Sequence, residues 1–163
     1  MDLHSQSEAM ALGVHFEPYI ARYAAKKLGL KVRAATRTLE YKGYPPVNLC
    51  ATPDYYVLNS RMLMEVKLSS ILYGWSEDDL HPHYEYQARA QMACTNRDVV
   101  IVVALVGSTF YHIPVVRDLQ KERLMLEAVD KFWMENVMAG VRPEPETQTR
   151  LRSAKSLGVE RHA

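Results

Sequence analysis

Two acidic residues and a lysine stand at a spacing that suits metal-assisted chemistry. Asp54 follows Pro53, and eleven positions later come Glu65, Val66 and Lys67 in succession. Because side chains alternate along a strand, Glu65 and Lys67 would share one face while Val66 points into the core. Two carboxylates and the backbone carbonyl of Val66 make a hard oxygen site suited to Mg²⁺ or Mn²⁺. A lysine beside such a metal can orient or deprotonate an attacking water, as phosphodiester hydrolysis requires.

The same residues also have an ordinary structural interpretation. A Glu-x-Lys triplet occurs by chance in about half of all chains of this length, and most such triplets lie on solvated strand faces. Pro-Asp is in addition a common turn dipeptide. The spacing alone therefore leaves both interpretations open, and the neighbouring segments have to be considered.

Five motifs follow one another along the chain. They are Glu-Pro at the end of 11–18, Ala-Thr-Pro-Asp at the end of 49–54, Glu-Val-Lys at the end of 63–67, Pro-x-Tyr-x-x-Gln-x-x-x-Gln-Met over 82–92, and Phe132-Trp133 with Gly140 and Pro143. In this order they resemble the YqaJ-like viral recombinase family, the lambda-exonuclease-type branch of the PD-(D/E)XK nucleases. The resemblance covers most of the chain and favours the catalytic interpretation.

The resemblance implies a role for each residue of the expected site. The residues that it assigns to metal binding are Asp54, Glu65, the Val66 carbonyl and, in support of the metal or its water, Glu17. Lys67 would be the catalytic lysine, and Gln87 would lie over the site. The helix over 83–95 agrees with this, because Tyr84, Gln87 and Gln91 fall on one helical face.

The implied activity is that of a divalent-metal-dependent deoxyribonuclease, a phage-type recombination exonuclease. Its substrate would be DNA, and a single-strand annealing protein would be its partner. The alternatives are a structure-specific endonuclease of the same fold and a catalytically silent DNA-binding module. The residues before the first expected helix hold no counterpart of the family's Gly- and Ser-rich segment with an Arg. We therefore expect a monomer or small oligomer that cuts distributively.

Composition and charge narrow the class of protein. The 163 residues fit one domain, and 48% of them are hydrophobic. The N-terminus has no signal-peptide core and no apolar run is long enough for a membrane span, so we expect the cytoplasm, that of a bacterial host if a phage encodes the chain. The two cysteines, Cys50 and Cys94, are too few for a disulfide framework or an iron–sulfur nuclease. His81 and His83 suit a polar loop better than a zinc site, because no further His or Cys falls at ligand spacing.

The net charge of +1 does not indicate a nucleic-acid partner, so any DNA surface must come from local clusters of Lys and Arg. One candidate is formed by Lys26, Lys27, Lys31, Arg33 and Arg37. These side chains either face phosphates together or make an ordinary solvated face, and the sequence favours neither.

Hydrophobic patterning predicts the elements that would position the site. Helices are expected over 8–28, with Gly29 as its end and a break or bend at Pro18, over 83–95, and from Asp118 to Gly140. Strands are expected over 31–41, 55–58, 62–68, 99–106 and 109–116. The expected core stripes are Ile20, Tyr23, Ala24 and Leu28 on the first helix and Leu126, Val129, Phe132, Trp133 and Val137 on the last. This order predicts an α/β, restriction-endonuclease-like fold with a mixed central sheet flanked by helices. The nuclease domain would span 1–145, followed by a flexible tail over 146–163.

Overall fold

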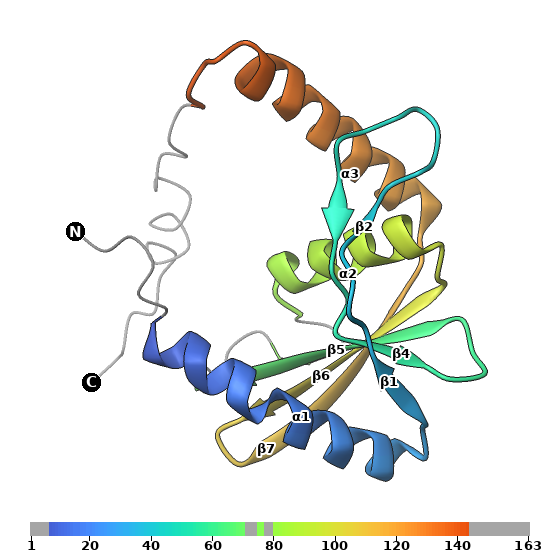
Figure 1. Cartoon of the computed structure of the whole chain (residues 1–163), viewed down its shortest axis with the longest axis vertical. Coiled ribbons are helices and arrows are strands. Elements are labelled where there is room, and N and C mark those ends of the chain that lie inside the picture. Colours follow the sequence, from blue (N-terminus) through green and yellow to red (C-terminus); the bar gives the residue numbers. More distant parts are fainter. Residues whose placement is uncertain (1–6, 71–74, 77–79, 144–163) are drawn as a thin grey trace, which may run out of the picture. The chain divides into compact units, whose positions relative to one another are not determined.

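The computed structural model of the chain describes residues 7–70, 75–76 and 80–143. By its contacts the chain divides into two compact units, Met1–Asp130 and Lys131–Ala163. The first unit contains a five-stranded sheet in the order β1-β4-β5-β6-β7 (Figure 1). Its strands are β1 (Val32–Ala34), β4 (Tyr55–Val57), β5 (Met62–Ser69), β6 (Val99–Val106) and β7 (Thr109–Val116). The β5–β6 pair is parallel and the other pairs are antiparallel, so the expected mixed central sheet is confirmed.

Helices α1 (Glu8–Leu28) and α2 (Pro82–Thr95) cover opposite faces of this sheet (Figure 1). The cause is the alternation of apolar side chains along the central strands. On the α1 face the core consists of Ile20, Ala21, Ala24, Val57, Met64, Val66 and Val103. On the α2 face it includes Leu63, Trp75, Ala88, Met92, Val100, Val102 and Ala104. Both faces of β5 and β6 are therefore buried, as the continuous apolar sequence of β6 predicts.

Helix α1 has the expected bounds. Ser7 caps its start by accepting a hydrogen bond from the Met10 N–H, and Gly29 ends it in the left-handed conformation at φ 66°. The helix continues through Pro18, so the expected break is wrong. Tyr23 was expected in the core but is exposed, and its ring lies against that of Phe110 with the centroids 5.2 Å apart. Ala21 is buried in the core instead.

The single strand expected over 31–41 is wrong. The chain forms β1, leaves the central sheet, and then forms β2 (Leu39–Glu40), which pairs with β3 (Cys50–Ala51) in a separate two-stranded sheet. The last hydrogen bond of this segment to the β4 side of the sheet is the one that the Ala35 N–H donates to the Asp54 carbonyl oxygen, and the chain leaves the central sheet after it. Cys50 and Cys94 are free thiols. The polar sequence over 71–82 predicts a loop, and most of this segment lies outside the described residues.

The last helix, α3 (Leu119–Phe132), begins as expected. Asp118 Oδ1 accepts hydrogen bonds from the backbone N–H groups of Gln120 and Lys121, at 2.9 and 3.0 Å. A π-helical segment, η1 (Trp133–Met138), follows it, and Gly140 ends the segment at φ 65°.

The expected core stripe on this helix is only partly correct. Leu126 is buried and Val129 is partly buried, whereas Phe132, the last residue of α3, is exposed. From Trp133 onward the wider π-helical turn brings residues five apart into register, so a stripe of three- and four-residue spacing does not continue into η1. The tail over 146–163 lies outside the described residues, and the domain boundary at 145 stays a prediction. Among the residues described, no helix has both the length and the apolar character to cross a membrane.

Candidate active site

Glu65 is the centre of a buried polar cluster on the α2 face of the sheet. Its side chain is only 2% exposed, and three side chains donate hydrogen bonds to it. Lys67 Nζ and Gln87 Nε2 both lie 2.6 Å from Glu65 Oε1, and Gln91 Nε2 lies 2.6 Å from Glu65 Oε2. Such charge-assisted bonds keep the carboxylate in one orientation. The expected shared face of Glu65 and Lys67 is confirmed.

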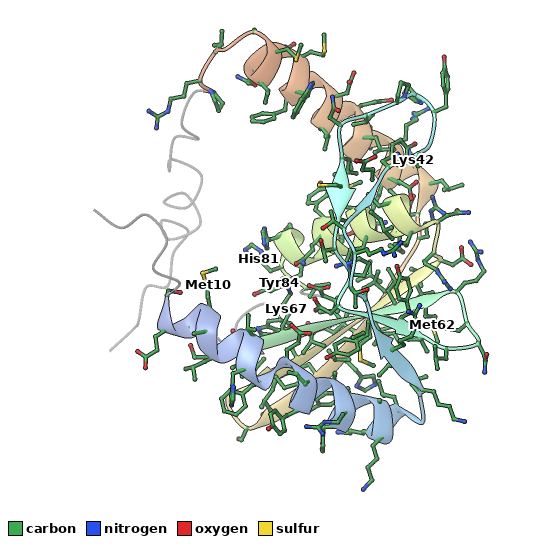
Figure 2. The ribbon with its side chains drawn as sticks, in the orientation of Figure 1. Met10, Lys42, Met62, Lys67, His81 and Tyr84 are labelled. Atoms are coloured by element: carbon green, nitrogen blue, oxygen red, sulfur yellow. The ribbon has the colours of Figure 1, made fainter. Side chains whose placement is uncertain are left out.

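Helix α2 supplies the polar strip that covers this cluster. Tyr84, Gln87 and Gln91 all face Glu65 or Lys67, as their helical spacing predicts, and the Lys67 ammonium lies 5.6 Å from the centroid of the Tyr84 ring (Figure 2). His81 caps the start of the helix, because its Nδ1 accepts a hydrogen bond from the His83 N–H at 3.2 Å.

Gln91 is a site residue that the sequence did not single out for a role. It is 1% exposed, and its Nε2 also lies 3.4 Å from the Thr52 carbonyl oxygen. Its Oε1 is buried without a hydrogen-bond partner among the described residues, so the site keeps one acceptor for a water or a ligand hydroxyl. The signal in the sequence was its position four residues after Gln87 on the same helix.

Asp54 approaches Glu65 from the start of β4. Its Oδ2 accepts a hydrogen bond from the Val66 N–H at 2.8 Å, just beyond the last β4–β5 residue pair, Tyr55 with Met64. In an extended strand the N–H and C=O of one residue project from the same edge. The Val66 carbonyl therefore points to the side on which Asp54 lies, while the Val66 side chain is buried towards α1 as predicted.

The carboxylates of the site crowd one another. Burial, followed by the negative charge of Glu65, raises the pKa of Asp54 from 3.8 to about 7, and Glu17 adds to the shift. Burial and then Glu17 also raise the pKa of Tyr55, so Glu17 lies within electrostatic range of both residues. The Val66 N–H and the Lys67 charge act in the opposite direction on Asp54 but do not cancel the shift. A divalent cation would relieve this excess of negative charge.

The donor set suits a hard divalent cation. Two carboxylates and a carbonyl lie close together where the start of β4 meets the middle of β5, and oxygen donors of this kind are what Mg²⁺ and Mn²⁺ prefer. Within the described ranges, no group of three or more His, Cys, Asp or Glu side chains has the geometry of a metal site. Glu17 therefore lies near Asp54 without completing a three-carboxylate cluster.

The expected basic patch is not one surface. Arg33 and Arg37 line a cavity with Arg97, beside Tyr56. Lys27 belongs to the last turn of α1, which packs on the other face of the sheet, and its Nζ lies 4.8 Å from the Phe110 ring centroid.

Comparison with known proteins finds one relative in sequence and several in fold. No family model matches it. The Bacillus subtilis protein YqaJ is 24% identical over 144 residues, which are 85% of this chain and 44% of that protein, so the chain spans less than half the length of this relative. An alkaline exonuclease from Laribacter hongkongensis has a TM-score of 0.61 at 18% identity, with 94% of this chain and 78% of that chain covered. A phage related exonuclease from Haemophilus somnus has a TM-score of 0.64 at 12% identity, with coverage of 86% and 77%.

These similarities bear on the expected fold and on the expected family resemblance. The solved structures share the mixed sheet flanked by helices, so the restriction-endonuclease-like fold is confirmed. The expected resemblance to YqaJ-like proteins is confirmed in sequence by the Bacillus subtilis protein, and the solved exonucleases resemble this chain in fold.

Proposed function

We propose that this chain hydrolyses phosphodiester bonds of DNA as an exonuclease that depends on Mg²⁺ or Mn²⁺. The observation that carries the proposal is the convergence of Asp54, at the start of β4, with Glu65 and Lys67, in the middle of β5. The solved relatives support it, because their descriptions name exonucleases, and one was solved in complex with dAMP.

Each residue of the site has a part in this chemistry. Asp54, Glu65 and the Val66 carbonyl would hold the metal, and Glu17 would support it from the side of Asp54. The bound cation would polarise the phosphate and lower the pKa of a water molecule.

The remaining side chains position these groups. Gln87 and Gln91 fix the two oxygens of Glu65, so that the carboxylate does not turn when charge develops. Lys67 places a positive charge beside Glu65, where it would orient the attacking water and offset charge on the phosphate.

The proposal is tested by digesting end-labelled linear DNA and covalently closed circular DNA side by side with Mg²⁺ or Mn²⁺. We expect loss of the linear DNA and survival of the circle. Loss of the circle as well would assign an endonuclease, and no digestion of either DNA would overturn the proposal. Lys67→Ala removes the catalytic lysine, and Lys42→Ala is its matched control, because the side chain of Lys42 is 79% exposed and pairs only with Glu40 among the described residues.

A single-strand annealing protein as partner rests on the family resemblance alone. Co-purification of the two proteins, with and without DNA, is the direct measurement. An interaction that disappears on nuclease treatment would mean that DNA bridges them.

A further inference from the structure

An arginine-lined groove lies on the α2 side of β1 and β4. It consists of two adjoining cavities of about 500 and 450 Å³, and both are lined by Arg33, Tyr56 and Arg97. Arg37 lines the first cavity and Arg61 the second. We call Arg33, Arg37 and Arg97, together with Tyr56, the arginine groove.

Tyr56 holds two of the guanidinium groups in place. The Cζ atoms of Arg33 and Arg97 lie 5.3 and 5.5 Å from the centroid of its ring, within the range of a cation–π interaction. Arg33 is directly opposite Tyr56 in the β1–β4 pair, and Arg97 Nη1 also donates to the Ser60 carbonyl oxygen at 2.6 Å. Two positive charges are therefore positioned by one aromatic ring.

Among the described residues, no carboxylate forms an ion pair with Arg33, Arg37 or Arg97. Neither cavity lining contains Asp or Glu, and the charge of Asp98 acts on Arg97 only from beyond ion-pair distance. The acid on the chain next to Arg97 is Asp98, and it pairs with Arg61. Like charges held together without a partner repel one another, so the groove favours an anionic ligand. Guanidinium groups bind phosphate oxygens in a forked geometry.

The groove lies on the same face of the sheet as the candidate active site. Tyr56 follows Asp54 by two residues, a rise of about 7 Å along a strand. Across the sheet Tyr56 pairs with Leu63, which precedes Glu65 by two. Thr95, at the end of α2, lines the groove, while Gln87 and Gln91 earlier in that helix bind Glu65.

We propose that the arginine groove binds the phosphates of the DNA strand adjacent to the phosphodiester that is cleaved. This inference rests on the proposed function and adds the surface that holds the substrate. A strand is the ligand, and not a single nucleotide, because the guanidinium groups are spread over two adjoining cavities and one phosphate would satisfy only some of them.

Binding can be measured separately from cleavage. The probe is a fluorescently labelled single-stranded oligonucleotide, and its anisotropy is followed in EDTA at several salt concentrations. We expect Arg33→Gln/Arg37→Gln to weaken binding about tenfold or more, and to reduce the salt slope by about 1 for each arginine that contacts a phosphate. Arg33 and Arg37 are exposed, so the thermal midpoint should stay unchanged. The matched control is Arg123→Gln on α3, whose side chain is 71% exposed and pairs with Glu127.

The outcomes separate this inference from the proposed function. If the double variant binds DNA with the affinity and salt slope of the wild type, or if the wild type does not bind the oligonucleotide, the groove is not a DNA site. Displacement of the oligonucleotide by dAMP or inorganic phosphate at equal phosphate concentration would also overturn it, since the ligand would then be a single phosphate.

Cleavage by the same variants is measured in Mn²⁺. For the double variant we expect a raised KM and an unchanged kcat, and a lowered kcat with unchanged KM would contradict the inference. If the double variant binds the oligonucleotide more weakly than the wild type, the groove is supported whatever the cleavage assay shows. If the wild type cleaves DNA without any metal, only the proposed function is overturned.

Discussion

Because of Asp54, the metal-free protein should become less stable as the pH rises towards 7. An acid whose pKa is lowered on folding has the opposite effect on stability. The pKa of Asp54 is about 7 in the folded chain, against 3.8 for the ordinary group, because this residue is buried next to Glu65. Between these values the folded state keeps a proton that the unfolded state loses. The free energy of unfolding therefore falls as the pH rises from about 4 to about 7, and it is level above that.

The size of the effect follows from the shift. A shift of about three pKa units corresponds to about 4 kcal/mol, of which about 2.5 kcal/mol falls between pH 5 and pH 7.5. Asp54 is partly exposed, and solvent screening reduces this to about 1–2 kcal/mol. In a domain of this size that is a change in the thermal midpoint of about 2–8 °C.

Asp54→Asn isolates this contribution, because an amide does not titrate. Thermal unfolding of the wild type and the variant in EDTA, at pH 5 and pH 7.5, gives a difference from which the six histidines cancel. We expect the wild type to lose about 1–2 kcal/mol more than the variant over this interval. Mn²⁺ should restore the wild type more at pH 7.5 than at pH 5, since a proton on Asp54 competes with the metal. Parallel curves for the two proteins would refute the crowding of Asp54 and Glu65.

Further predictions concern the partners of the buried carboxylates of Glu65 and Glu122. Gln91→Leu removes one of three donors to Glu65 and should lower the free energy of unfolding by about 2 kcal/mol in urea, whereas no change would mean that the bond contributes nothing. Lys67→Ala should abolish cleavage without weakening Mn²⁺ binding in calorimetry, because the lysine competes with the metal for Glu65; full activity would remove it from the mechanism. Arg117→Met should cost about 3 kcal/mol, because it leaves Glu122 buried without its two hydrogen bonds, and a midpoint equal to the wild type would contradict this. EDTA should stop cleavage while circular dichroism stays that of the folded chain.

The elements that the sequence predicted well are those whose apolar pattern is long and regular. The bounds of α1, β6 and β7 agree with the expectation, and β4, β5 and α2 differ by a residue or so. Glu17 lies on α1, Glu65 and Lys67 on β5, Gln87 on α2, and Asp54 directly before β4. Their roles were expected from the family resemblance, and the antiparallel β4–β5 pair is what brings Asp54 towards Glu65.

The elements that were predicted wrongly depend on contacts distant in sequence. The chain over 31–41 alternates like one strand, but its second half pairs with Cys50 and Ala51 in another sheet, and no local pattern reveals that partner. The stripe expected up to Val137 does not continue beyond α3, because from Trp133 the backbone is a π-helix, which alters the period on which the prediction rests.

The arginine groove shows the same limit for binding residues. Arg33 and Arg37 are close in sequence and were considered together with three lysines, but Arg97 follows α2 and was not included. Only the β1–β4 pair, which places Arg33 opposite Tyr56, and the return of the chain after α2 bring Arg97 to the same ring. A sum of charges along the sequence would therefore have counted Lys27, which lies by Phe110 on the other face of the sheet, and omitted Arg97. Nucleic-acid surfaces in a chain of net charge +1 have to be assigned from the sheet order, because that order decides which charges share a face.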